Sequence, residues 1–195
     1  MNATSPRLIL ASSSPRRSSL LQQFGLPFQT AHPRVEERVE PTANPHALVA
    51  HNARLKAEAV PALTVPFVSL GADTVVVFEG RILGKPADWN DARRMLSLLN
   101  GQAHEVLTGV HLTAPLSGRA CAFVESTRVH FHHRSEQERE AYLQRIDPLD
   151  KAGAYAAQED DGWLIASLEG SRTNVIGLPM ERLLLELAAF DIFPR

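Results

Sequence analysis

The sequence predicts a mixed α/β fold, in which a twisted sheet is flanked by helices. Runs rich in β-branched residues alternate with segments whose apolar residues recur at helical spacing, without strict strand–helix–strand order. The chain has 195 residues and 44% apolar content, enough for one sizeable core or for two lobes that share a cleft. No internal repeat divides it, so we expect a single domain over residues 1–195.

The N-terminal segment predicts a strand followed by a helix. Residues 7–11 (RLILA) form a short apolar run, and Ser14 with Pro15 is typical of an N-cap and a first helical position. Gly25 suits the C-terminal cap of this helix. The remaining expected elements are a loop over 32–45, a helix over 45–60, strands over 67–78 and 81–83, a helix over 88–100, paired strands over 104–113 and 120–131, a helix over 135–145, a strand over 163–168 and a helix over 179–189.

Composition excludes several classes of protein. The chain has 20 Lys and Arg against 22 Asp and Glu, and a net charge of -2 argues against a general nucleic-acid or membrane-surface binder. No apolar run approaches the roughly 18 residues of a membrane span, and the N-terminus lacks the apolar stretch of a signal peptide. The single Cys121 cannot form an internal disulfide. We therefore expect a cytoplasmic protein that binds neither nucleic acid nor membrane.

Two adjacent arginines stand in the opening turn of the first predicted helix, where the helix dipole disfavours positive charge. Arg16 and Arg17 follow the serines of SSSP (12–15). A phosphate chain would compensate for them, because it accepts hydrogen bonds from helix amides, serine hydroxyls and guanidinium groups together. The alternative is a solvated charge pair beside a serine cap, and the spacing alone leaves both interpretations open.

One acidic residue lies within the apolar segment GADTVVV (71–77). An unpaired buried carboxylate is costly, so Asp73 needs a metal, a cation or a catalytic role. It could position Mg²⁺ or activate a water that attacks phosphorus, and both are recurrent carboxylate roles in phosphoryl chemistry. The alternative is an aspartate that stabilises a turn at a strand junction.

The segment GRILGKP (80–86) superficially resembles a P-loop. It is one residue short between the glycines, and Pro86 stands where the motif needs Ser or Thr for Mg²⁺, so we reject a Walker A motif. Lys85 can still contact phosphate as a point charge, with an ordinary surface lysine as the alternative.

Six ordered segments span nearly the whole chain and share one resemblance. They are LILASSSPRR (8–17), GADTVVV (71–77), GKP (84–86), GQAHEVLTGV (101–110), DKAGAYAAQ (150–158) and NVIGLP (174–179). Together these segments resemble the Maf family of nucleoside triphosphate pyrophosphatases. The resemblance implies a mixed α/β fold with a deep cleft between two lobes, a homodimer, and a divalent cation, Mg²⁺ or Mn²⁺. It also implies cleavage of a nucleoside triphosphate to the monophosphate and pyrophosphate.

The resemblance implies roles for individual residues. Asp73 would be the catalytic carboxylate, either as proton acceptor for the attacking water or as a metal ligand, and Glu37 would be a second metal ligand. For Glu37 and Lys56 the alternatives are a solvated loop acid and an exposed helical lysine. The residues implied to bind the triphosphate are Ser12, Arg17, Lys56 and Lys85.

Three positions separate family types that act on dTTP and UTP from types that act on 7-methyl-GTP. Here they are Arg16, Thr74 and Gln158, and all three resemble the dTTP/UTP type. A glutamine amide offers a donor and an acceptor, which match the adjacent N3–H and carbonyl of uracil or thymine. Glu159 stands next to Gln158, and a carboxylate would suit a cationic methylguanine. A 7-methyl-GTP pyrophosphatase is therefore an alternative.

We expect a pyrophosphatase for dTTP and UTP, with modified pyrimidine nucleotides as further candidate substrates. A second alternative is a nucleotide-sensing regulator of septum formation that uses the same cleft without turnover. An anion site plus a carboxylate would also serve a γ-phosphatase, so the products must decide between these activities.

Overall fold

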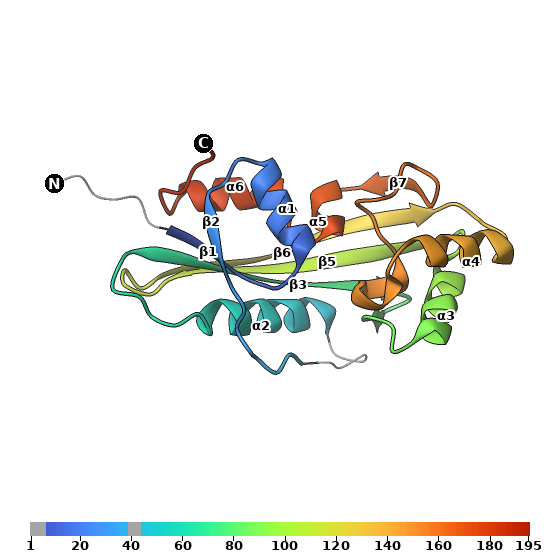
Figure 1. Cartoon of the computed structure of the whole chain (residues 1–195), viewed down its shortest axis with the longest axis horizontal. Helices are drawn as coiled ribbons and strands as arrows, with labels where there is room; N and C mark the ends of the chain where they lie inside the picture. The colour runs from blue at the N-terminus through green and yellow to red at the C-terminus, as the bar shows by residue number, and fades with distance from the viewer. Residues whose placement is uncertain (1–6, 39–43) are drawn as a thin grey trace.

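The computed structural model describes residues 7–38 and 44–195, and a mixed seven-stranded sheet forms its centre (Figure 1). β1 runs parallel to β2 and β3, whereas the other pairings are antiparallel. This confirms the predicted mixed α/β fold. The strand order is β2 (Phe28–Ala31), β1 (Arg7–Ala11), β3 (Phe67–Phe78), β5 (Ala103–Ala114), β6 (Arg119–Phe131) and β7 (Ile165–Glu169), and the short β4 (Arg81–Leu83) pairs with the end of β3.

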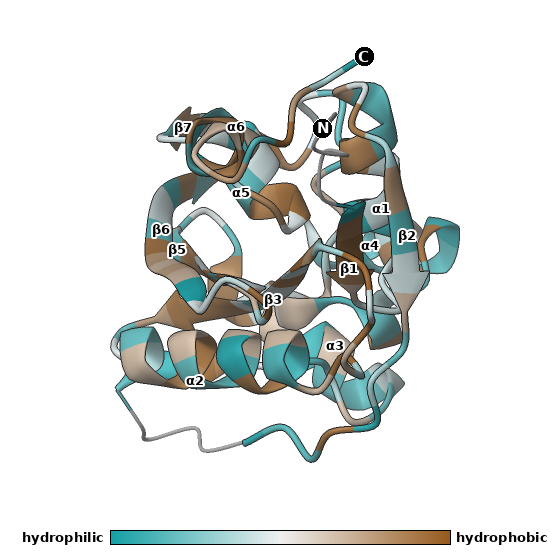
Figure 2. Ribbon diagram, turned by 90° about the vertical axis from the view of Figure 1, so that its left-hand side faces the viewer, coloured by the Kyte–Doolittle hydropathy of each residue, from teal (hydrophilic) through white to brown (hydrophobic). Residues whose placement is uncertain are grey.

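Helices cover both faces of the sheet, as the two views in Figures 1 and 2 show. α2 (Pro45–Glu58) lies along one face, and α1 (Pro15–Gln23), α5 (Arg172–Ile176) and α6 (Met180–Ala188) lie on the other. α3 (Trp89–Leu99) and α4 (Glu136–Arg145) pack together near one end of the sheet, close to the 3₁₀ turns η1 (Pro148–Asp150) and η2 (Ala152–Ala154). Across the described ranges, no helix combines the length and apolar character that crossing a membrane requires.

The predicted strands and helices are confirmed to within about two residues at their ends, but one short strand, one short α-helix and the two 3₁₀ turns were not expected. β2 has only four residues, FQTA, which are too few and too polar for a clear strand pattern. α5 has five residues, RTNVI, which is little more than one helical turn. Part of the loop predicted over 32–45, residues 39–43, lies outside the described residues.

Two hydrophobic clusters form the two predicted lobes. In the first, side chains of β1, α1 and α6 pack together, including the fully buried Leu10 and Leu21. In the second, side chains of α3, α4, β6 and β7 pack together, including the fully buried Leu96 and Leu143. Ile176 of α5 packs against both clusters, so α5 joins the two lobes.

β3 changes neighbours halfway along its length. β1 pairs with β3 only as far as Leu70, and β4 pairs with it from Val76 onward. Within the described chain, residues 71–75 therefore have no partner strand on this edge. Asp73 and Thr74 lie in this open stretch and point to opposite faces of the sheet, because successive strand residues alternate. This open edge of β3 forms part of the candidate site, because Asp73 and Thr74 both line its cavity.

Two glycines allow α2 to approach the sheet closely. A Cβ on Gly71 would lie 2.1 Å from the carbonyl oxygen of Ala53, and a Cβ on Gly109 would lie 2.4 Å from that of Val49. Any larger residue at these positions would push the helix away from the strands. The backbone of α2 is therefore seated directly on β3 and β5.

Candidate active site

A cavity of about 690 Å³ opens between the two lobes. Its volume lies in the range of about 300–1,000 Å³ that is typical of small-molecule sites. Every residue that the sequence singled out as a site residue lines this cavity: Ser12, Arg16, Arg17, Glu37, Lys56, Asp73, Thr74, Lys85 and Gln158. Tertiary structure thus brings them together, while the role of each one remains a prediction.

Asp73 forms an ion pair with a buried lysine of α2. Asp73 Oδ1 lies 2.8 Å from Lys56 Nζ, and the two side chains are only 12% and 10% exposed. Lys56 Nζ also donates to the carbonyl of Ala72 at 3.3 Å. Asp73 lies in the middle of β3 and has a cation as its partner, so the alternative of a turn-stabilising aspartate is wrong.

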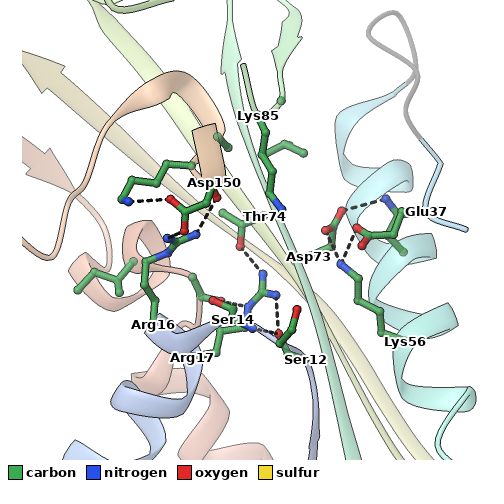
Figure 3. Close-up of a pocket in the computed structure, with 18 of the residues that line it drawn as sticks. Ser12, Ser14, Arg16, Arg17, Glu37, Lys56, Asp73, Thr74, Lys85 and Asp150 are labelled. Atoms are coloured by element: carbon green, nitrogen blue, oxygen red, sulfur yellow. Dashed lines mark hydrogen bonds and ion pairs between the residues drawn. The ribbon is translucent and has the colours of Figure 1, made fainter. Parts of the chain in front are cut away.

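Glu37 reaches the same lysine from the loop that follows β2. Glu37 Oε2 lies 2.7 Å from Lys56 Nζ, so two carboxylates meet at one ammonium group (Figure 3). Lys56 is buried, which excludes the alternative of an exposed helical lysine. Its contact with phosphate stays a prediction.

Asn52 binds the second carboxylate oxygen of Asp73. Asn52 Nδ2 donates to Asp73 Oδ2 at 3.0 Å, and Asn52 lies one helical turn before Lys56 on α2. Sequence reasoning did not single out Asn52. Its spacing of four residues from Lys56, which places both on the same helix face, is the signal that could have identified it.

The two carboxylates form a donor set that suits a divalent cation. Mg²⁺ and Mn²⁺ prefer oxygen ligands, and Asp73 and Glu37 direct carboxylate oxygens to one point. In the part of the chain that the structure describes, no three His, Cys, Asp or Glu side chains gather for metal binding. Two carboxylates are nevertheless sufficient protein ligands where substrate phosphates and water complete the shell, as is common for Mg²⁺.

Arg17 occupies another wall of the cavity, and its hydrogen-bond partners are uncharged. Its Nε donates to the carbonyl of Gly177 at 2.9 Å. Its Nη1 and Nη2 donate to Ser12 Oγ at 3.3 Å and to Thr74 Oγ1 at 3.0 Å. Burial lowers the pKa of the Arg17 guanidinium, while the charge of Asp73 opposes this effect.

Arginine nevertheless stays protonated in proteins, so Arg17 is a buried cation. Within residues 7–38 and 44–195, no carboxylate forms an ion pair with it. A phosphate group would supply the missing negative charge. The alternative of a solvated arginine is therefore wrong for Arg17.

Arg16, in contrast, already has a carboxylate partner. Its Nη1 lies 2.7 Å from Asp150 Oδ2, and its Nη2 donates to the Asp150 carbonyl at 3.2 Å. Partial burial raises the pKa of Asp150, but hydrogen bonds from Lys151 and Arg16 outweigh this effect and keep that pKa below its usual value. The pair ties α1 to η1. Asp150 thus balances the charge of Arg16, whereas the described partners of Arg17 are all uncharged.

Thr74 connects Arg17 to α5 through a chain of hydroxyl groups. Thr74 Oγ1 lies 3.0 Å from Thr108 Oγ1, and the Thr108 hydroxyl donates to the carbonyl of Asn174 at 3.1 Å. The Thr108 hydroxyl has one hydrogen and donates it to the Asn174 carbonyl. Thr74 must therefore be the donor in the contact between the two threonine hydroxyls. Thr74 then accepts from Arg17, so its hydroxyl fixes the guanidinium in the cavity wall.

Gln158 lies at the rim of the cavity, in a segment that a buried carboxylate organises. Asp160 accepts hydrogen bonds from three backbone N–H groups within residues 162–165, at 2.8 to 3.2 Å. Gln158 Nε2 donates to Glu159 Oε1 at 3.0 Å. Gln158 is a lining residue, whereas Glu159 is not.

Lys85 is exposed and points into the pocket from the turn after β4 (Figure 3). The preceding residues form a hairpin, in which β4 pairs antiparallel with the end of β3. A P-loop would instead lead from a strand into a helix, so the rejection of a Walker A motif is confirmed. Phosphate binding by Lys85 stays a prediction.

Comparisons with known proteins agree with the six sequence segments. A sequence model described as Maf-like protein matches residues 7–190. The chain is 41% identical over 186 residues to a dTTP/UTP pyrophosphatase of Bacillus thuringiensis subsp. konkukian (strain 97-27), covering 95% of this chain and 96% of that protein. A dTTP/UTP pyrophosphatase of Bacillus cereus (strain ATCC 10987 / NRS 248) is also 41% identical, covering 95% of this chain and 91% of that protein.

A solved structure shares the fold. The Staphylococcus aureus Ham1 protein aligns with a TM-score of 0.51 and 16% sequence identity, covering 94% of this chain and 98% of that chain. At this identity the likeness concerns the fold alone. The match of the family model over residues 7–190 and the 41% identical relatives show that the chain belongs to the Maf-like protein family.

Proposed function

We propose that this protein hydrolyses dTTP and UTP to the nucleoside monophosphate and pyrophosphate. The observation that carries this proposal is that Arg17, a buried cation with no carboxylate partner among the described residues, lines the same cavity as the carboxylate Asp73. An anion site beside a carboxylate is what hydrolysis of a phosphoanhydride needs. The names of the 41% identical relatives support the choice of dTTP and UTP.

In this proposal Asp73 accepts the proton of the attacking water. The water oxygen bonds to the α-phosphorus, and the bond between that phosphorus and the bridging oxygen breaks, so that pyrophosphate leaves with the electron pair. Lys56 and Asn52 each hold one oxygen of Asp73, which fixes the orientation of the carboxylate. A divalent cation, Mg²⁺ or Mn²⁺, held by Asp73 and Glu37 would neutralise phosphate charge when bound.

The basic residues stabilise the leaving pyrophosphate. The guanidinium of Arg17 matches two phosphate oxygens, because its planar group can form two parallel hydrogen bonds. Lys85 adds a point charge from the opposite rim, and the hydroxyl of Ser12 lies beside Arg17 at the end of β1. Preorganised positive charge of this kind is worth most where the leaving group gains negative charge.

Gln158 distinguishes the base. Its amide can accept from N3–H and donate to the adjacent carbonyl of thymine or uracil. Arg16 and Thr74 shape the same cavity through their contacts with Asp150 and Arg17. Glu159, which would suit 7-methylguanine, lies outside the cavity lining, and this favours a pyrimidine substrate.

The proposal also includes the cation, a homodimer and a cytoplasmic location. A single cysteine, which cannot form an internal disulfide, suits a reducing compartment. A chelator should abolish turnover, and Mg²⁺ or Mn²⁺ should restore it. Light scattering tests the dimer, for which twice the chain mass of 21.4 kDa is expected.

Pyrophosphate release tests the function directly. We expect turnover of dTTP and UTP with Mg²⁺ or Mn²⁺, and a loss of roughly 10²- to 10⁴-fold in the Asp73→Asn variant. In ¹⁸O-labelled water the label should enter the monophosphate, because the α-phosphorus is attacked. CTP, ATP, GTP and 7-methyl-GTP are the comparison substrates.

Other products or substrates would overturn parts of the proposal. Orthophosphate plus a nucleoside diphosphate would identify a γ-phosphatase, and preference for 7-methyl-GTP would overturn the role of Gln158. Nucleotide binding without turnover of any substrate would favour the regulatory alternative. Mn²⁺ affinity tests the metal-ligand role of Asp73, since Asp73→Asn should weaken Mn²⁺ binding. Unchanged Mn²⁺ affinity would overturn that role and leave Asp73 as proton acceptor alone.

A further inference from the structure

The loop that carries Glu37 is attached to the protein through one face of α2. Residues 32–38 run along the cavity, and most of them line it. Among the described residues, the polar contacts to this loop come from two side chains. Asn52 binds the backbone of Arg38, and Lys56 binds the Glu37 carboxylate. The same two side chains also bind Asp73, so each of them joins the loop to the candidate catalytic carboxylate.

Asn52 uses its whole amide group for these contacts. Its Oδ1 accepts from the Arg38 N–H at 3.0 Å, and its Nδ2 donates to the Arg38 carbonyl at 3.1 Å. The second hydrogen of Nδ2 goes to Asp73 Oδ2 at 3.0 Å. Asn52 is 2% exposed. A buried amide whose hydrogens and oxygen all have partners is held in one orientation, so it fixes Arg38 and Asp73 relative to each other.

We propose that Asn52 is a positioning residue for the two carboxylates of the active site, an inference that rests on the proposed function. It holds the loop against α2, so that Glu37 and Asp73 meet at Lys56. By occupying Oδ2 it also keeps Oδ1 of Asp73 directed at the lysine. Without Asn52, the only described polar contact left to the loop is the ion pair of Glu37 with the buried Lys56, and the Glu37 side chain is 45% exposed to solvent.

The packing of α2 leaves it no room to move toward the sheet. The carbonyls of Val49 and Ala53 lie so close to Gly109 and Gly71 that α2 is already at the limit of its approach to the sheet. Loss of the Asn52 amide should therefore release the loop rather than move the helix.

Asn100 offers a matched control, because it makes the same pair of backbone bonds elsewhere. Its Oδ1 accepts from the Arg134 N–H at 2.8 Å, and its Nδ2 donates to the Arg134 carbonyl at 3.0 Å. Asn100 is not a lining residue of the cavity. Asn52→Leu and Asn100→Leu thus remove equivalent backbone contacts, and only the first removes a contact to Asp73.

Limited trypsin digestion tests whether the loop is released. We expect cleavage after Arg34 and Arg38, followed by mass spectrometry, to be roughly 10-fold faster in Asn52→Leu than in the wild type, because the loop loses two hydrogen bonds. Asn100→Leu should match the wild type. Equal rates in the wild type and Asn52→Leu would overturn the proposal. If Asn52→Leu does not fold, Asn52→Asp is nearly isosteric, keeps an acceptor for the Arg38 N–H and loses both donated bonds.

Metal binding and kinetics test whether the released loop matters for the site. With pyrophosphate present, Asn52→Leu should bind Mn²⁺ about 10-fold more weakly by electron paramagnetic resonance, as is common when a residue that orients metal ligands is lost. The kcat for dTTP should fall about 10- to 100-fold, while KM changes less. Asn100→Leu should leave all three values unchanged. Faster trypsin cleavage with unaltered Mn²⁺ affinity and kcat would overturn the positioning role.

The two hypotheses fail separately. A wild-type protein that hydrolyses no nucleotide would overturn the proposed function. The comparison of trypsin cleavage and Mn²⁺ affinity between the Asn52 and Asn100 variants needs no turnover, so it would still decide the role of Asn52.

Discussion

Lys56 and Arg17 are buried basic side chains in the wall of the same cavity, but their positive charges are balanced differently. Lys56 Nζ lies 2.7 Å from Glu37 and 2.8 Å from Asp73. Arg17 donates to one carbonyl and two hydroxyl groups. Lys56 is therefore neutralised by carboxylates of the protein, whereas no carboxylate of residues 7–38 or 44–195 pairs with Arg17. The α2 side of the cavity therefore organises carboxylates, and the α1 side is prepared for an anion.

The geometry of the two cations explains this division. An ammonium group has three hydrogens, and those of Lys56 have three acceptors within reach, on Ala72, Asp73 and Glu37. A guanidinium group has five hydrogens, and Arg17 uses three of them in the described contacts. Two N–H groups of Arg17 thus remain for phosphate oxygens.

The largest loss of stability is expected from removing Lys56, the cation that carboxylates balance. Lys56→Met leaves Asp73 buried without a charged partner, and breaking such a pair costs about 3 kcal/mol. The midpoint of urea unfolding should fall accordingly. Arg17→Met is the control and should fall less, because it leaves no carboxylate unpaired. Equal midpoints for Lys56→Met and the wild type would show that Asp73 does not depend on this cation.

Removing Arg17, the cation that no described carboxylate balances, should weaken anion binding. Arg17→Met should weaken binding of inorganic pyrophosphate, measured by calorimetry, by about 2 kcal/mol or roughly 30-fold, because charged hydrogen bonds to phosphate are lost. Arg17→Lys keeps the charge without the planar group and should recover part of the affinity. If Lys56→Met weakened pyrophosphate binding as much as Arg17→Met, the division between the two sides would be wrong.

His104 shows a third way to bury a base, which is to keep it neutral. Burial lowers its pKa to about 3, and its Nε2 lies 3.1 Å from the Tyr155 hydroxyl. Because the unfolded chain binds this proton near pH 6.5 and the folded chain does not, stability should fall as the pH drops below 6.5. The loss should approach about 2 kcal/mol between pH 6.5 and 5. Urea midpoints at the two pH values should differ less in His104→Phe, and parallel pH slopes would contradict this assignment.

Asp160 is the acidic counterpart of Arg17, since its described hydrogen-bond partners are backbone N–H groups. Asp160→Asn keeps only one accepting oxygen, so stability should fall by about 1 kcal/mol, measured by thermal unfolding. The segment with Gln158 should also loosen, and the preference for dTTP over 7-methyl-GTP should fall. A variant with normal stability and normal preference would show that Asp160 does not organise this segment.

The sequence by itself determined most of the secondary structure and the composition of the site. Helical spacing, caps and β-branched runs are local patterns, so they predicted the long strands and helices to within about two residues. Arg17 and Asp73 stood out because they break local rules, the first at a helix start and the second within an apolar strand. Glu37, Lys56 and Gln158 break no local rule, and only the resemblance to the Maf family pointed to them. β2 escaped prediction because four residues carry too little pattern.

Tertiary structure alone decided which charge has which partner. Arg16 meets Asp150 across 134 residues and Arg17 meets Gly177 across 160, separations over which local patterns carry no information. The contacts of Asn52 with Arg38 and Asp73 exist because Gly71 and Gly109 let α2 press against the sheet. Sequence patterns report local periodicity and the cost of burial, whereas the pairing of buried charges depends on distances that only the packed sheet and helices set.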